Sequence, residues 1–303
     1  MTAQRIDGVA IARGIEAEAA EASRALKRAG LAPHLVTIQV GQSPATDVYI
    51  QNQHRRFAPL GIQFTHLDLD AEASETTVID HVRSLNTNPT VTGIMVTLPL
   101  PPGMNPVRVQ EAVDPRKDVE GVSPFNLGNL ILNRATVGPC TALAVLEAIR
   151  ATRVPTAGAR AVVVGHSNIV GMPVTLCLLR DLATTTTCHV ATRDLASETR
   201  NADILVVAVG KPGLVSGNMI KPGAVVVDVG INRVPVDPAL PGGKTRLVGD
   251  VAFEEAASRA SWISPVPGGI GPITVAILAR NVVTCARGIL DARPARGDPA
   301  RGE

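Results

Sequence analysis

The sequence predicts a two-domain α/β protein built on parallel sheets, and three observations lead to this prediction. The chain has 303 residues, which is enough for two domains of ordinary size. Strand-like apolar runs alternate with helix-like segments along most of it, as in parallel sheets with crossover helices. At 161–164 a wholly apolar, β-branched run breaks at Gly165 into a turn, and Pro173 then opens a helix-like run over 174–179.

The first half of the chain shows this alternation repeatedly. The segments 99–103 and 114–125 are expected to be loops, the second of them polar and unlike a core. The first follows a strand, and open α/β sheets bind ligands at the carboxyl ends of their strands. The expected elements are helix 8–29, strand 34–40, helix 46–57, strand 61–69, helix 76–85, strand 93–98 and a bridging helix from 141 to 151.

The second half repeats the pattern with more apolar strands. A Pro/Gly-rich segment at 265–272 precedes the last expected helix, and the Pro/Arg/Gly-rich tail from Arg293 is expected to fray. The expected elements are strands 161–164, 184–190, 204–209 and 224–229, two short strand-like segments at 247–248 and 262–263, and helix 274–286.

Composition narrows the class of protein. Hydrophobic residues make up 45% and charged residues 18%, which is typical of a globular chain, and with 2% aromatics the core must consist of Ala, Val, Leu and Ile. A net charge of +2 gives no reason to expect nucleic-acid binding. The four cysteines are far apart and without metal-ligand spacing, and no signal-peptide core or membrane-spanning apolar run is recognised. We therefore expect a soluble cytoplasmic protein with reduced cysteines, no metal, and neither membrane nor nucleic-acid partners.

The strand, glycine turn and helix that begin at residue 161 form the type of unit that binds a diphosphate on backbone N–H groups at a helix N-terminus. The spacing here is G-x-S-x-x-V-G-x-P rather than G-x-G-x-x-G. From the pattern alone, a cofactor turn and a plain strand-to-helix turn both stay open.

Motifs along the chain, taken together, resemble those of the FolD family of methylenetetrahydrofolate dehydrogenases/cyclohydrolases. The resemblance extends over about residues 5–290. The motifs, in family order, are VGQSPATDVYI, GIMVTLPLPPG, DPRKDVEGVSPFNLG, GPCTA, VVVGHSNIVGMP, VAVGKPG, DVGINR, VGDV and SPVPGGIGPITVAIL.

This resemblance implies a fold and a set of partners. It implies a folate-binding catalytic domain over 1–140, completed by a C-terminal helix within 272–295, and a Rossmann-like domain over 141–271 that binds NADP or NAD, with a flexible tail at 296–303. A tetrahydrofolate-type substrate would lie in the cleft between the domains. The family also implies a homodimer.

The resemblance implies site residues by matching position. Folate would contact Tyr49, Gln53, Leu98, Pro99, Glu120 and a mobile loop with the helix start behind it, namely Pro267, Gly268, Gly269, Ile270, Gly271 and Thr274. The diphosphate and adenosine side would involve Gly165, His166, Ser167, Val170, Gly171, Pro173, Val190 and Arg193. The nicotinamide side would be formed by Gly210, Lys211, Gly230 and Ile231. The catalytic set would be Tyr49, Gln53, Thr97 and Glu120.

Three of these positions depart from the family pattern. Gln53 stands where bifunctional members have a lysine, Thr97 where they usually have glutamine, and Glu120 where an aspartate normally holds the pterin. A partly buried amine can exchange protons near neutral pH, whereas a glutamine amide cannot. His54, the next residue, points about 100° away around a helix. We expect weak or absent cyclohydrolase activity.

The adenosine side departs too. His166 stands where the family has an arginine that contacts the 2′-phosphate of NADP, and Val190 replaces a residue that is often polar. Loss of a guanidinium removes a bidentate phosphate contact, which Arg193 could supply instead. NAD and NADP both stay open, with a slight preference for NAD.

Three functions are consistent with these residues. The first is oxidation of 5,10-methylenetetrahydrofolate to the methenyl form with NAD(P), because hydride transfer depends on positioning rather than on the lysine. The second is a FolD-derived enzyme that acts on another substrate in a specialised pathway. The third is a catalytically inactive folate- or nucleotide-binding paralogue.

Overall fold

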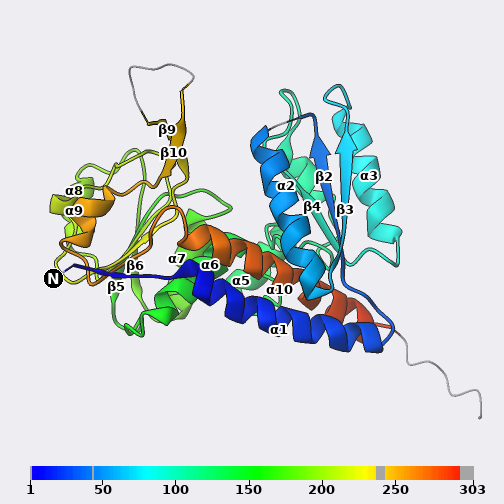
Figure 1. Ribbon diagram of the computed structural model, residues 1–303, viewed down its shortest axis with the longest axis horizontal. Helices are drawn as coiled ribbons and strands as arrows, with labels where there is room; N and C mark the ends of the chain where they lie inside the picture. The colour runs from blue at the N-terminus through cyan, green and yellow to red at the C-terminus, as the bar shows by residue number, and fades with distance from the viewer. Residues whose placement is uncertain (1, 43, 237–242, 294–303) are drawn as a thin grey trace, which may run out of the picture. The chain divides into compact units, whose positions relative to one another are not determined.

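The computed structural model describes residues 2–42, 44–236 and 243–293; the side chains of residues 44, 45 and 47–49 also lie outside the described part. The chain divides into two compact units (Figure 1). Unit 1 comprises Met1–Glu16 and Pro124–Leu278, and unit 2 comprises Ala17–Ser123 and Ala279–Glu303. Two long helices, α1 (Gly8–Arg28) and α10 (Ile270–Asp291), contribute residues to both units.

Unit 2 contains a three-stranded parallel sheet in the order β3-β2-β4. Alternate residues of β2 point to opposite faces. Val36 and Ile38 pack with Val78 and Val82 of α3, while Thr37 contacts Gln53 of α2, so the two helices cover opposite faces. The elements are β2 (His34–Val40), α2 (Pro44–Phe57), a 3-10 turn (Ala58–Leu60), β3 (Gln63–Leu69), α3 (Glu75–Thr87), β4 (Gly93–Val96) and α4 (Pro106–Glu111).

The expected polar loop at 114–125 is in part a buried element, which corrects the sequence-based prediction. Lys117, Asp118 and Val119 are all buried. The Lys117 ammonium donates to the carbonyl oxygens of Leu85 (2.9 Å) and Asn88 (2.8 Å), so its polar atoms are satisfied inside the unit. A charged segment can be buried when its groups are hydrogen-bonded, and sequence alone does not reveal those partners.

Unit 1 contains a six-stranded parallel sheet in the order β1-β11-β8-β7-β5-β6. From β5 the chain goes to β6 on one side and then crosses back to β7 on the other, so β5 adjoins the switch point where ligands bind in such sheets. The strands are β1 (Gln4–Arg5), β5 (Arg160–Val164), β6 (Thr184–Cys188), β7 (Ile204–Val207), β8 (Val225–Asp228) and β11 (Trp262–Ile263), with a separate antiparallel pair, β9 (Asn232–Pro235) and β10 (Thr245–Val248).

Both faces of this sheet are buried. Ala161 and Val163 of β5 pack with α6 and α7 on one face, and Val162 and Val164 pack in a second cluster on the other. Burial on both faces explains why the strands read as continuous apolar runs. The remaining helices are α5 (Pro124–Ile131), α6 (Cys140–Ala151), α7 (Gly171–Arg180), α8 (Leu195–Arg200), a 3-10 turn (Gly217–Met219) and α9 (Phe253–Ala257).

The two-domain α/β architecture is as predicted. β1 pairs with β11 and α5 packs on α7, so by their contacts the first strand and the segment from Pro124 belong to unit 1. The predicted domain bounds at residues 140 and 271 stay a prediction. The two-residue β1 and the short helices α4, α5, α8 and α9 have too few residues for a periodic signal.

The last helix, α10, is longer than the predicted 274–286. By length and composition it is apolar enough to span a membrane. However, 61% of its most apolar stretch is buried inside the structure, as in the core helix of a globular protein. Its C-terminal part packs within unit 2, where the Asn281 amide donates to the Val119 carbonyl (2.9 Å). The predicted fraying of the tail concerns residues that lie largely outside the described part.

Candidate functional site

The turn between β5 and α7 is fixed by two glycines. Gly165 has φ +126°, and a Cβ there would clash with the Ala208 carbonyl. A Cβ on Gly171 would clash with the Gly165 carbonyl, so only glycine lets the first turn of α7 sit directly on the end of β5. The Ser167 hydroxyl accepts from the N–H groups of Val170 (3.2 Å) and Gly171 (3.4 Å).

This turn meets the requirements of a dinucleotide diphosphate site. It lies at the carboxyl end of a strand beside the switch point, and it opens a ten-residue helix whose N-terminal N–H groups attract anions. Pro173 is buried in the first turn of α7, where its missing N–H leaves no hydrogen bond unmade. Of the predicted diphosphate residues, Gly165, Ser167, Val170, Gly171 and Pro173 therefore come together in one turn.

The residues predicted for the adenosine side follow β5 and β6. His166 comes directly after Gly165, whereas Val190 is fully exposed and Arg193 is exposed. The ring of His166 lies beside that of His189, with ring centroids 5.3 Å apart and an interplanar angle of 46°. His189 was not among the predicted site residues; its position directly after the second strand of the sheet was the available signal.

On the nicotinamide side, Gly210, Lys211 and Ile231 are exposed in loops that follow β7 and β8. Two buried aspartates connect these loops, and we call Asp228 and Asp250 the aspartate bracket. Their motifs, DVGINR and VGDV, are among those that carry the family resemblance, but no role was predicted for the two aspartates. The available signal was an acidic residue within two positions of a glycine at the end of an apolar run.

The aspartate bracket is a dense set of hydrogen bonds. Asp250 Oδ2 accepts from the N–H groups of Val209 (2.7 Å) and Gly210 (2.9 Å), and its Oδ1 accepts from the Asn232 amide (2.8 Å). Asp228 Oδ1 accepts from the N–H groups of Gly230 and Asp250, both at 2.9 Å. Burial raises the pKa of Asp228 to about 6, although its backbone hydrogen bonds oppose that shift.

The predicted loop at 267–271 leads into α10. The Gly269 N–H donates to the Pro265 carbonyl (2.8 Å), and a Cβ on Gly8 would clash with the Gly269 carbonyl, so the loop packs tightly on the start of α1. Pro267 is exposed, and Gly268 has φ +102° with open space beside it. At the start of α10, Ile270 is buried, and its carbonyl accepts from the Thr274 hydroxyl at 3.1 Å.

In unit 2 the position of the family lysine is enclosed. Gln53 is 0% exposed, its Oε1 accepts from the Thr37 hydroxyl (3.5 Å), and its Nε2 lies 3.5 Å from the sulfur of Met95. Thr97 is also buried, and its hydroxyl donates to the Ile38 carbonyl (3.3 Å). Neither side chain has a group that exchanges protons near neutral pH.

Glu120 is the carboxylate of the predicted catalytic set in unit 2. Its side chain is partly buried, and this desolvation, with the nearby Asp118 charge, raises the pKa of Glu120 to about 8. Asp118 itself accepts from the N–H groups of Gly121 (2.9 Å) and Ser123 (2.8 Å). Leu98 and Pro99 are exposed directly after β4. The predicted Tyr49 lies in α2, but its side chain is outside the described part.

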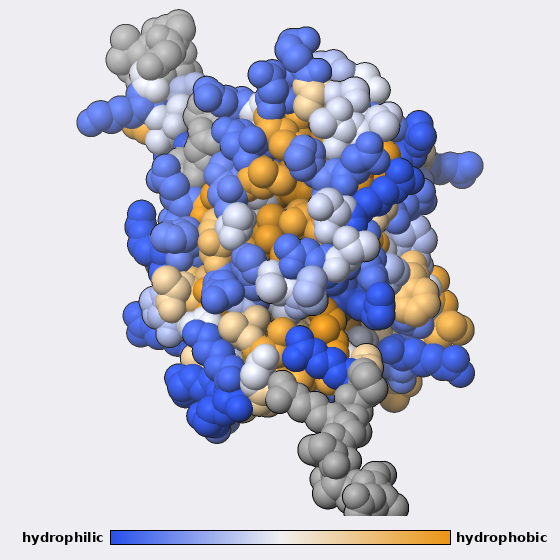
Figure 2. Space-filling model, turned by 90° about the vertical axis from the view of Figure 1, so that its right-hand side faces the viewer, coloured by the Kyte–Doolittle hydropathy of each residue, from blue (hydrophilic) through white to orange (hydrophobic). Residues whose placement is uncertain are grey.

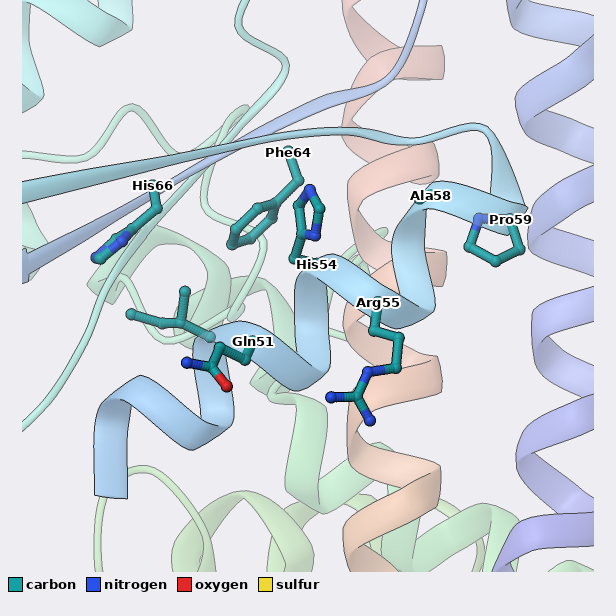
Figure 3. A pocket seen from close by; sticks show the side chains of 8 residues that line it. Gln51, His54, Arg55, Ala58, Pro59, Phe64 and His66 are labelled. Carbon is teal, nitrogen blue, oxygen red and sulfur yellow. The ribbon is translucent and has the colours of Figure 1, made fainter. Parts of the chain in front are cut away.

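His54 lies in a surface groove (Figure 3), whereas the preceding residue, Gln53, is fully buried. Its ring packs edge-on against Phe64, with centroids 5.8 Å apart, in a groove of about 840 Å³. The lining residues are Ile50, Gln51, His54, Arg55, Ala58, Pro59, Phe64 and His66. The face drawn in Figure 2 carries apolar side chains in its middle, with polar ones around them.

The cysteines and the possible metal ligands are the remaining reactive side chains. All four cysteines are free, and three of them are buried, as expected for packing residues. Within residues 2–42, 44–236 and 243–293, no group of three or more His, Cys, Asp or Glu side chains is arranged to hold a metal ion.

Comparisons with known proteins match both halves of the chain. The family model for the catalytic domain of tetrahydrofolate dehydrogenase/cyclohydrolase matches residues 6–120, and that for its NAD(P)-binding domain matches residues 139–289. The bifunctional protein FolD of Moorella thermoacetica is 46% identical over 287 residues, which cover 95% of this chain and all of that protein.

Two solved structures are similar throughout. The bifunctional FolD enzyme of Campylobacter jejuni is 38% identical with a TM-score of 0.88, and the match covers 94% of this chain and 99% of that one. The FolD protein of Trypanosoma brucei, complexed with NADP cofactor and inhibitor, is 38% identical with a TM-score of 0.89, and the match covers 95% of this chain and 98% of that one.

Proposed function

The chain belongs to the tetrahydrofolate dehydrogenase/cyclohydrolase family, and from this premise we propose an NAD(P)-dependent 5,10-methylenetetrahydrofolate dehydrogenase whose cyclohydrolase activity is weak or absent. The Moorella thermoacetica and Campylobacter jejuni relatives are described as bifunctional. The proposal therefore distinguishes this chain from them by its cyclohydrolase activity. The observation that carries it is the side chain at position 53.

The dehydrogenase half needs a positioned cofactor rather than a titrating side chain. The bound nicotinamide supplies the hydride acceptor. The glycine turn at Gly165 and Gly171 can hold the diphosphate, and the aspartate bracket fixes the loops that carry Gly210 and Gly230. Positioning alone contributes a large part of the rate of such a reaction.

The cyclohydrolase half needs proton transfer to and from water at the methenyl carbon. Gln53 cannot act as acid or base, and it is fully buried between Thr37 and Met95. His54 lies in the groove against Phe64 and does not replace it. Any residual hydrolysis would depend on Glu120, whose pKa of about 8 allows proton exchange near neutral pH.

The test follows reduced cofactor and methenyl product separately after mixing purified protein with methylenetetrahydrofolate and NAD or NADP. We expect cofactor reduction with accumulation of the methenyl form, and partial recovery of hydrolysis in Gln53→Lys. Glu120→Gln is the matched second variant: it removes residual hydrolysis if Glu120 supplies it. Methenyl consumption by the unmodified protein well above the spontaneous rate would refute the proposal.

The two alternatives predict other outcomes of the same assay. Poor folate affinity with intact cofactor binding would indicate a different substrate. Cofactor and folate binding without turnover would indicate an inactive paralogue. The latter is disfavoured because the glycine turn and the tightly packed Gly269 loop are both retained.

We further propose a homodimer. α5 and α7 pack together in unit 1, and the large apolar side chains at their ends are between 54% and 72% exposed. Apolar surface of this kind favours a protein–protein interface. Light scattering should give twice the subunit mass, and Leu132→Glu with Leu182→Glu should give the single mass. The exposed residues are Phe125, Ile131, Leu132, Leu179 and Leu182.

The proposed location is the cytoplasm. Four free cysteines support it, because exported proteins commonly oxidise such residues. Fractionation of the native cells with detection of this chain would test it; recovery in the membrane or periplasmic fraction would contradict it.

A further inference from the structure

Two histidines stand side by side at the carboxyl ends of neighbouring strands in unit 1. β5 and β6 pair in parallel with Val164 opposite Cys188, and the Gly165 N–H donates to the Cys188 carbonyl (2.9 Å). His166 follows β5 after Gly165, and His189 follows β6 directly; both histidines are exposed. Their ring centroids are 5.3 Å apart.

The fold assigns this place to the adenosine ribose. When a diphosphate sits on the turn after the first strand of such a sheet, the residue at the end of the second strand reads the ribose 2′ position. An acidic residue there accepts from the 2′-hydroxyl of NAD, whereas a cation favours the 2′-phosphate of NADP. This chain has neither a carboxylate nor a permanent cation there, but a pair of imidazoles.

The two rings differ in their freedom to take up a proton. His189 Nδ1 accepts from the Ala191 N–H (3.2 Å), which leaves Nε2 to carry the hydrogen of the neutral ring. Within the described residues the His166 side chain makes no hydrogen bond or ion pair, and its ring contacts the ring of His189. Both ring nitrogens of His166 are thus available to a ligand, whereas Nδ1 of His189 is not.

Four charged residues on neighbouring segments must be considered beside His166. Arg193 and Asp194 follow β6, Lys211 follows β7 and Glu198 lies in α8. The Asp194 carboxylate caps α8 by accepting from the Ser197 N–H (2.9 Å). Arg193 and Lys211 are permanent cations on flexible, exposed stems; they favour anions at every pH in use and so give no pH dependence.

We propose that His166 and His189 form a proton-dependent selector for the 2′-phosphate, so that this chain discriminates NADP from NAD according to pH. The inference rests on the proposed use of NAD(P) at the β5–α7 turn. Protonated His166 pairs with the phosphate and neutral His189 donates a hydrogen bond from Nε2. At higher pH, His166 is neutral and the preference for NADP declines towards that for NAD.

The expected magnitude follows from charge pairing. Loss of one charge-assisted hydrogen bond to the phosphate should lower phosphate affinity about tenfold between about pH 6.5 and pH 8.5. Below about pH 6 the phosphate itself takes up a proton, which weakens binding again. The affinity for a 2′-phosphorylated ligand should therefore pass through a maximum as the pH rises. The affinity for a ligand without the 2′-phosphate should not change with pH over the range from about pH 6.5 to pH 8.5.

Calorimetric titration with 2′,5′-ADP and with 5′-AMP, at several pH values and in two buffers of different ionisation enthalpy, tests the selector without an activity assay. We expect proton uptake and a tenfold decline only for 2′,5′-ADP. His166→Arg should bind 2′,5′-ADP tightly with no decline at high pH. His166→Gln should also lose the decline and keep only the pH-independent preference for 2′,5′-ADP that Arg193 and Lys211 give.

Three results would overturn the inference. One is the same pH dependence for both ligands; another is an unchanged decline in His166→Gln; the third is binding of 2′,5′-ADP without proton uptake. Failure of the premise that the β5–α7 turn binds NAD(P) has a different signature, because then neither ligand, nor NADP nor NAD, would bind at any pH. Failure of the dehydrogenase proposal alone would leave these binding results unchanged and show only in the activity assay.

Discussion

The glycine turn of unit 1 and the Gln53 environment of unit 2 hold their functional positions in different ways. In unit 1 the geometry comes from the backbone: Gly165 and Gly171 leave no room for a Cβ, and Asp250 binds loop N–H groups. In unit 2 the enclosed position 53 carries a glutamine, so the proposed loss of hydrolysis depends on the identity of one side chain. A site whose geometry comes from the backbone can keep its function when the side chains around it are exchanged. A site that depends on one side chain can lose a reaction when that side chain is replaced.

The largest expected effect comes from breaking the backbone-built site. Gly171→Ala places a methyl group against the Gly165 carbonyl and should cost about 3 kcal/mol of unfolding free energy, with at least about tenfold weaker NADP binding. Gly14→Ala in α1 is the matched control, because a Cβ there meets nothing within 4 Å. It should be neutral or stabilise the helix by up to about 1 kcal/mol. Denaturant unfolding and calorimetry measure both; equal effects of the two variants would contradict the close-packing argument.

The next largest effect concerns the aspartate bracket. Asp250→Ala leaves the N–H groups of Val209 and Gly210 without their acceptor and should cost about 2–4 kcal/mol, with weaker cofactor binding. The double variant Asp250→Asn with Asn232→Asp can rebuild the network, because the new amide accepts from the loop and donates to the new carboxylate. Unfolding curves should show the swap to be more stable than either single variant. Additive losses would mean that the pair does not act as a unit.

A smaller effect is expected on the pH dependence of stability, through Glu120. Glu120 has a folded-state pKa of about 8, above its ordinary value of 4.5, so the folded protein holds this proton more tightly than the unfolded chain does. Its contribution to stability is therefore present at low pH and is lost as the pH rises from about 4.5 to about 8. Glu120→Gln should lose this slope and gain on the order of 2 kcal/mol over the unmodified protein at about pH 8. Urea unfolding at several pH values checks it, with Glu111→Gln as an exposed control.

Sequence reasoning predicted the backbone-built region better than the side-chain region. Apolar runs identify the buried strands β5, β7 and β8 because burial on both faces needs apolar residues throughout. The aspartate bracket and the His189 partner of His166 have no such periodic signal, since they result from contacts between residues far apart in the chain. For the same reason the burial of Lys117 was missed, as its carbonyl acceptors come from another segment.

Substitution of His54 is expected to have almost no effect on either activity. His54 follows Gln53 directly, yet its ring lies against Phe64 in a surface groove (Figure 3), while Gln53 is enclosed with Thr37. His54→Gln should therefore change the dehydrogenase rate and the slow methenyl hydrolysis by less than about twofold, because surface changes of this kind rarely perturb a distant group. Its contribution to the Phe64 contact should cost no more than about 1 kcal/mol. Steady-state rates over a pH series are the measurement, since a proton-transfer role would shift the pH profile even where the rate at one pH hardly changes. A lost acidic or basic limb in His54→Gln would show that proton chemistry moved by one residue along α2 rather than disappearing with the lysine.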